Sequence, residues 1–157
     1  MKIYTSYFYQ VRFFKSNMLP MSTAIWDPKW FHDFKDQKHL FIDKRGIVNG
    51  LRMPAFAPGE SCTGLCAGVD SCKDQNPKKC KFLKAYKKQL KKLNFDKVMN
   101  HLTKCCDQLI KFDDPVVVLL FHEIPNNPCS ERKAVQDWFN EHGIEVTELK
   151  YPIKDNY

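Results

Sequence analysis

Four of the chain's seven cysteines lie in one short stretch, CTGLCAGVDSCKDQNPKKC, between positions 62 and 80. Thiolates are soft ligands, and four of them close together satisfy a tetrahedral zinc ion or a 4Fe–4S cluster. The stretch lacks the C-x2-C pairs of common zinc ribbons and ferredoxins, so the identity of the metal stays open. We expect Zn²⁺ first, an iron–sulfur cluster second, and thiols without metal, reduced or disulfide-bonded, third. The predicted metal ligands are Cys62, Cys66, Cys72 and Cys80.

The residues around these cysteines indicate a structural role for the metal. The stretch contains Gly64, Gly68 and Pro77 and few apolar side chains, so packing alone would order it weakly. Metal binding can supply that ordering free energy. A closed four-thiolate site also leaves no open coordination position for a substrate. We therefore expect a structural metal site in a cysteine-rich insertion at about residues 58–81 of a single domain that spans residues 1–157.

A second group of reactive residue types follows the most apolar run of the chain. PVVVLLF, at 115–121, is typical of a strand buried on both faces, and FHEIPNNPCSER begins at its last residue. Ligands of open α/β sheets bind at the carboxyl ends of the strands, and a helix N-terminus attracts anions. A thiol at such a helix start is also activated as a nucleophile. The predicted catalytic residues are Glu123 as acid or base, Cys129 as nucleophile, and Arg132.

The same loop also has a purely structural interpretation. Ser130 would then be only a helix N-cap, Arg132 a surface ion-pair partner, and Cys129 a buried filler. In the functional interpretation the loop, with Ser130 among its contacts, binds a small anionic or nucleotide-like ligand, and whether the protein is an enzyme stays open. The sequence has no Walker loop, G-x-G-x-x-G, H-E-x-x-H or nucleophile elbow, so the common enzyme classes gain no support.

The positive charge of the chain is concentrated beside the cysteines. The net charge is +7, and the segment from Lys73 to Lys92 alone holds nine lysines against one acid. An alternative function is therefore a binding module, in which the metal loop and the basic helix expected over 80–93 contact nucleic acid. The lysines that would make this contact are Lys84, Lys88 and Lys91. A lysine-rich helix face is also commonly just solvated, and a host protein is a further possible partner.

The pattern of apolar residues predicts the elements that must position these groups. Strands are expected at 1–10, 115–121 and 144–151, with a further apolar stretch at 21–26. A short helix should follow Asp27-Pro28, and an irregular or hairpin-like segment should cover 39–53. Apolar stripes predict helices over 80–93 and 95–110, and 125–143 should be a turn followed by a helix that ends at Gly143. The order indicates an α/β fold with a small, mostly parallel sheet flanked by helices, Rossmann-like and three-layered.

Nothing in the sequence predicts a contact with a membrane. No apolar run approaches the length of a bilayer span, and the first residues read as a strand rather than as a signal peptide. We therefore expect a cytoplasmic protein, in whose reducing surroundings cysteines bind metal more readily than they form disulfides.

Two segments carry a resemblance to a known family. VVVLLFHEIPNNPCSERKAVQDWFNEHGIEVTEL resembles the C-terminal signature of the DUF488 family, and KIYTSYF through PMSTAIWDPKW is similar to its phage and bacterial branch. The family is of uncharacterised function, so the resemblance implies a fold and the location of a site. It implies that Thr5, Ser6 and Tyr7 join Glu123, Cys129 and Arg132 around one pocket. The sequence departs from the family pattern because Ser130-Glu131 separates Cys129 from Arg132, and the histidine of that pattern is missing.

Overall fold

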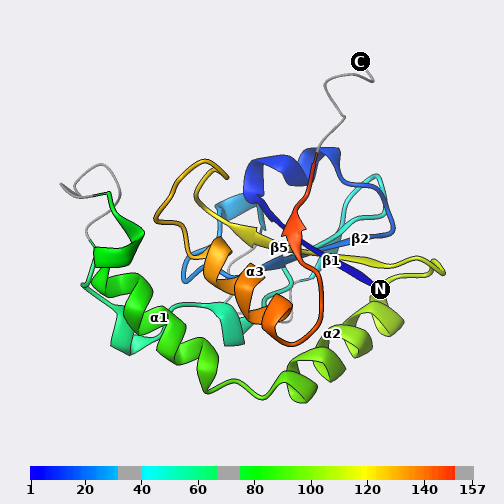
Figure 1. The fold of residues 1–157 in the computed structure, drawn as a ribbon. Helices are drawn as coiled ribbons and strands as arrows, with labels where there is room; N and C mark the ends of the chain where they lie inside the picture. Colours follow the sequence, from blue (N-terminus) through cyan, green and yellow to red (C-terminus); the bar gives the residue numbers. More distant parts are fainter. Residues whose placement is uncertain (32–39, 67–74, 151–157) are drawn as a thin grey trace.

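The computed structural model describes residues 1–31, 40–66 and 75–150, which form an α/β fold around a four-stranded sheet (Figure 1). The strand order is β2-β5-β1-β6, and every neighbouring pair is parallel. The predicted α/β class and the parallel sheet are thereby confirmed. The strands are β1 (Lys2–Tyr7), β2 (Met18–Ser22), β5 (Val116–Phe121) and β6 (Thr147–Glu148).

The apolar run at 115–121 forms β5, which lies inside the sheet between β2 and β1. Its residues from Val117 to Phe121 are fully buried. Alternate side chains point to opposite faces, because successive residues of a strand do so. Val117, Leu119 and Phe121 belong to one core cluster, and Val118 and Leu120 to another. The prediction of a strand buried on both faces is confirmed.

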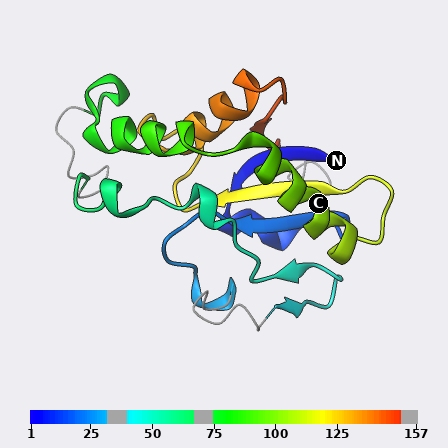
Figure 2. The same ribbon diagram turned by 90° about the horizontal axis from the view of Figure 1, so that it is seen from below.

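Three α-helices pack on the first of these clusters (Figures 1 and 2). They are α1 (Lys81–Lys91), α2 (Phe95–Leu109) and α3 (Arg132–Glu141). The side chain of Asn94 caps α2 by accepting a hydrogen bond from the Lys97 amide at 3.0 Å. Gly143, with φ of +83°, follows the end of α3. The predicted apolar stripes are buried, including Tyr86, Leu90, Leu102, Trp138 and Phe139.

The opposite face of the sheet is covered by short 3-10 helices and a small hairpin (Figure 2). Here the expectation of a strand over 1–10 is wrong at its end, because β1 stops at Tyr7 and η1 (Phe8–Phe13) follows. The reason lies in the spacing of Phe8, Val11 and Phe14, which places one large apolar side chain every three residues and suits a 3-10 helix. All three are buried against Val118 and Leu120.

The remaining elements differ from expectation in extent. The second strand is Met18–Ser22 rather than the stretch at 21–26, and the last strand keeps two residues of the expected eight. The helix expected after Asp27-Pro28 appears as η2 (Lys29–Phe31), beyond which residues 32–39 lie outside the described part. The expected hairpin is confirmed as β3 (Phe41–Ile42) paired antiparallel with β4 (Val48–Asn49). Three further 3-10 turns are η3 (Pro54–Phe56), η4 (Glu60–Cys62) and η6 (Pro77–Lys79).

No helix in the described segments combines the length and the apolar character needed to cross a bilayer.

Candidate functional site

The loop after β5 borders a cavity of about 670 Å³, which we call the strand-end cavity. Glu123, Cys129 and Glu131 line it together, so two of the three predicted catalytic residues meet there. Phe82 contributes from α1, and Cys66 contributes from the cysteine stretch. The other lining residues are Gln75, Ile124, Asn126, Asn127 and Pro128. The volume lies within the range of small-molecule sites.

The strand-end cavity holds two carboxyl groups, and the pKa of one of them, Glu131, is strongly raised. Burial and, to a smaller extent, the negative charge of Glu123 raise the pKa of Glu131 to about 8, against the opposing effect of Arg132. Glu131 is 8% exposed, and Oε2 of Glu123 is buried without a hydrogen-bond partner in residues 1–31, 40–66 and 75–150. Near neutral pH the cavity therefore holds a protonated carboxyl as a donor, with a second carboxyl beside it. The sequence reasoning missed Glu131, although it stands between two residues that were singled out.

The backbone amides around Cys129 are already used within the loop. The Cys129 amide donates to Oδ1 of Asn127 at 2.9 Å, and the Ser130 amide donates to the Asn127 carbonyl at 3.3 Å. The Arg132 amide donates to Oγ of Ser130 at 3.3 Å. These amides would have to break existing bonds to bind a phosphate.

Arg132 lies inside the protein, 4% exposed, and it is not among the residues that line the strand-end cavity. Its Nη2 donates to the carbonyls of Ser6 at 3.2 Å and Glu123 at 2.7 Å, and its Nε lies 3.0 Å from Oε2 of Glu148. The guanidinium carbon is 5.5 Å from the centre of the Phe121 ring. Arg132 thus connects the carboxyl ends of β1, β5 and β6 and positions the loop that carries Glu123.

Of the residues expected from β1, Thr5 and Ser6 join this buried network, and none of the three lines the strand-end cavity. Thr5 and Ser6 are fully buried. Oγ1 of Thr5 donates to Oε2 of Glu148 at 2.7 Å and accepts from Nε2 of Gln136 at 2.7 Å. The Tyr7 hydroxyl accepts a hydrogen bond from Gln10, and its ring stacks on Tyr9 with centres 6.5 Å apart. The expected single pocket is therefore divided: Glu123 and Cys129 line the cavity, while Thr5, Ser6, Tyr7, Ser130 and Arg132 do not line it.

Two cysteines of the predicted metal set flank α1. Cys80 caps the helix, because its Sγ accepts a hydrogen bond from the Leu83 amide at 3.4 Å. Cys62 is buried, and its Sγ lies 3.7 Å from Oε1 of Gln89. Cys66 is exposed, whereas Cys72 lies outside the described residues. No three His, Cys, Asp or Glu side chains in the described ranges are gathered as metal ligands. A shared metal would have to draw Cys62, Cys66 and Cys80 together, so the metal site stays a prediction.

The lysines of α1 form a groove of about 440 Å³ along one side of the helix, here called the lysine groove. Lys84 and Lys88, both predicted for nucleic-acid contact, lie in it, whereas the third, Lys91, is exposed and is not a lining residue. The other lining residues are Ser61, Lys81, Ala85, Gln89 and Lys92. The side chain of Gln89 ties the helix to the preceding segment, since it accepts from the Gly59 amide at 2.8 Å and donates to the Ala57 carbonyl at 2.7 Å.

Comparison with known proteins finds no matching family, no matching curated protein and no matching solved structure. The resemblance to the DUF488 family therefore stays a prediction. Any function has to be argued from the residues themselves.

Proposed function

We propose that the protein binds a small polar ligand in the strand-end cavity and that Glu123 and Glu131 exchange a proton with it. The observation that carries this proposal is the pair of carboxyl groups lining one cavity, one of which keeps its proton near neutral pH. Such a pair can accept a hydrogen bond through one member and donate one through the other, the arrangement that general acid–base chemistry needs. If the protein is an enzyme, these two residues are the acid and the base, and Cys129 is placed to act as the nucleophile.

The chemistry of the lining favours a neutral or cationic ligand with N–H groups, such as an amide, amine or amidine. Two carboxyls and the amides of Asn126 and Asn127 face this ligand, while Arg132 is engaged behind the cavity. A nucleotide-like ligand would enter through its base rather than its phosphate. The cavity lining is thus complementary to a ligand that carries both donors and acceptors.

A panel of small probes tests this proposal. Benzamidine, nicotinamide and imidazole represent donor-bearing ligands, and inorganic phosphate and benzoate represent anions. We expect the donor-bearing probes to change chemical shifts in NMR spectra of the protein. These changes should be lost in Glu123→Gln and in Cys129→Ser. They should be kept in the control Glu141→Gln, at the exposed end of α3. Preference for phosphate or benzoate would restore the anion interpretation. Unfolding of both site variants would make the loop purely structural.

We also propose that the four cysteines bind Zn²⁺ as a structural ion, with a 4Fe–4S cluster as the alternative. Support comes from the chemistry of the donor set and from the positions of two ligands at α1. Cys80 lies at the helix N-terminus, and Cys62 packs near Gln89 of the same helix. Bound metal would hold the cysteine stretch on α1. On this basis we describe the chain as a Rossmann-like three-layer domain with an inserted metal loop.

A second candidate function is the binding of nucleic acid along the lysine groove. The observation in its favour is that four lysines at helical spacing line one groove. A phosphate backbone would be attracted to these charges with a strong dependence on salt. A host protein with an acidic surface would use the same groove.

A further inference from the structure

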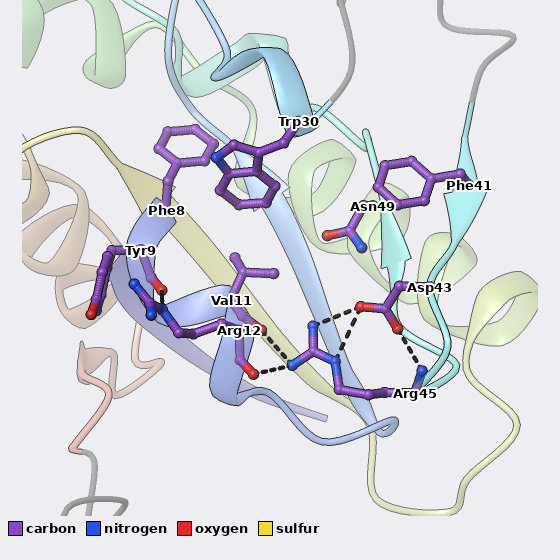
Figure 3. A pocket seen from close by; sticks show the side chains of 9 residues that line it. All are labelled: Phe8, Tyr9, Val11, Arg12, Trp30, Phe41, Asp43, Arg45 and Asn49. Carbon is purple, nitrogen blue, oxygen red and sulfur yellow. Dashed lines mark hydrogen bonds and ion pairs between the residues drawn. The ribbon is translucent and has the colours of Figure 1, made fainter.

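A second cavity, of about 360 Å³, lies on the sheet face opposite the α-helices (Figure 3). We propose that it is a binding site for a nucleobase, separate from the strand-end cavity. We call it the aromatic cavity, because four of its nine lining residues are aromatic. The lining residues are Phe8, Tyr9, Val11, Arg12, Trp30, Phe41, Asp43, Arg45 and Asn49.

Aromatic side chains form much of its wall. Figure 3 shows Phe8 and Trp30 at one end of the cavity, with Phe41 and Tyr9 on opposite sides. The Phe8 and Trp30 rings meet edge to face, with centres 6.4 Å apart and planes at 81°. Phe8 is buried, which fixes this contact, but Trp30 is 50% exposed and Tyr9 is 55% exposed. Aromatic rings that are half-exposed and packed beside a buried ring can stack on a planar ligand.

Asn49 adds a polar group within this apolar wall. It comes from β4, is 2% exposed, and lies between Trp30 and Asp43 in Figure 3. Its Nδ2 donates to the Ile47 carbonyl at 3.4 Å, a long bond, and its Oδ1 is buried without a hydrogen-bond partner in the described part of the chain. An unsatisfied buried acceptor costs free energy, which a ligand N–H would recover. An amide presents a donor and an acceptor side by side, as a nucleobase edge requires.

Two arginines lie at the other end of the cavity, and they differ in what they already bind (Figure 3). Arg45 is engaged, because it forms an ion pair with Asp43 at 2.6 Å and donates to the carbonyls of Val11 and Arg12. Burial would raise the pKa of Asp43, but its hydrogen bonds from Arg45 and from the Ile47 and Arg45 amides bring it below its ordinary value. The carboxylate therefore stays ionised and neutralises Arg45.

Arg12 is the cation that remains for a ligand. Its guanidinium lies over the Tyr9 ring, 3.4 Å from the ring centre, and its Nε donates to the Tyr9 carbonyl at 3.3 Å. Within residues 1–31, 40–66 and 75–150, no carboxylate pairs with it. A guanidinium held over an aromatic ring keeps its charge available for a phosphate. The base would thus lie against Trp30 and Asn49, with its phosphate toward Arg12.

The cavity favours a nucleobase over a purely apolar ligand, because the Asn49 amide lies between aromatic rings and Arg12 is nearby. The base could belong to a free nucleotide or to a single-stranded nucleic acid, since both present the same edge and the same plane. The inference does not depend on the strand-end cavity, which lies on the loop after β5 and shares no lining residue with the aromatic cavity.

Calorimetry at low salt tests the proposal. The probes are the four nucleoside monophosphates, the matching nucleosides and a ten-nucleotide single-stranded RNA. We expect Trp30→Ala to weaken binding about 5- to 150-fold, the range given by loss of one stacking contact. The matched control is Trp26→Ala, which removes an exposed tryptophan that does not line the cavity. Arg12→Ala should weaken nucleotides and leave nucleosides unchanged.

The comparison of probes identifies the source of the base. If the RNA binds more tightly than any monophosphate, and Trp30→Ala abolishes this binding, the site takes a single strand. If a monophosphate binds more tightly than the RNA, the site takes a free nucleotide. Asn49→Leu should also weaken binding, with its fold checked by circular dichroism. Absence of binding by every probe at millimolar concentration overturns the proposal, as does equal weakening by Trp30→Ala and Trp26→Ala.

Discussion

Nε of Arg132 lies 3.0 Å from Oε2 of Glu148, so the first residue of α3 is paired with the last residue of β6. Arg132 is 4% exposed at its side chain and Glu148 is 25% exposed. The pair is therefore mostly shielded from water. Because α3 begins directly after the loop that carries Cys129 and Glu131, this contact fixes the position of the strand-end cavity relative to the sheet.

Arg132→Met should destabilise the protein by about 3 kcal/mol, because it leaves Glu148 without its cation and removes the donors to the Ser6 and Glu123 carbonyls. The free energy of unfolding in urea measures this change. The exposed pair of Lys133 and Asp137, 2.6 Å apart on the same helix, is the matched control. Lys133→Met should cost less than about 1 kcal/mol. Equal losses in the two variants would show that burial of Arg132 contributes nothing.

Stability should fall as the pH rises from about 5 to 8, because of Glu131. Its pKa is about 8 in the folded chain, against an ordinary value of 4.5. The folded state then binds more protons than the unfolded state in this window, so the free energy of unfolding decreases with pH by at most about 1.4 kcal/mol per pH unit. Urea unfolding at several pH values measures the slope. Glu131→Gln should flatten it, whereas Glu141→Gln should leave it unchanged.

Purified protein should contain about one zinc per chain if the cysteine stretch is a structural staple. Elemental analysis alongside a visible absorption spectrum distinguishes this from a cluster, which would give several irons and a brown colour. Cys62→Ser and Cys80→Ser should lose the metal and lower the melting temperature, and Cys129→Ser should keep both. A folded, metal-free protein would refute the metal prediction.

Nucleic acid should bind along the lysine groove with an affinity that falls steeply with salt. In gel shifts with single-stranded RNA at low salt, Lys84→Glu with Lys88→Glu should abolish the complex. Lys91→Glu should have a smaller effect, because Lys91 does not line the groove. Lys97→Glu with Lys104→Glu, on the exposed face of α2, makes an equal change of charge and should be tolerated. Equal loss in both double variants would indicate only a response to net charge.

Periodicity predicted the parts of the fold that are governed by local patterns. The run from Val116 to Phe121 is apolar throughout, and the stripes of α1, α2 and α3 repeat at helical spacing, so each could be read without knowing its neighbours. The turn of the chain into η1 was also present in the sequence, as the spacing of three between Phe8 and Val11, but the β-type composition of the first residues masked it.

The candidate site was less predictable, because its geometry depends on contacts between distant segments. Arg132 meets Glu148 only because β1 lies between β5 and β6, an order that no local pattern specifies. The burial of Glu131 follows from packing around the loop, and that of Asn49 from its place on β4. Glu123 and Cys129, which residue type suggested, line one cavity, whereas residue type could not show that Arg132 does not line it.

The position of β1 has a consequence for the synthesis of the chain. Lys2 pairs in register with Val116, and Tyr4 pairs with Thr147, so both neighbours of the first strand are made more than a hundred residues after it. A nascent chain halted before residue 116 would present β1 with two unsatisfied edges. Such a strand is exposed to wrong partners while the ribosome completes the rest. Folding of the sheet must therefore wait for nearly the whole chain, and the slow closure of so long a loop sets its pace.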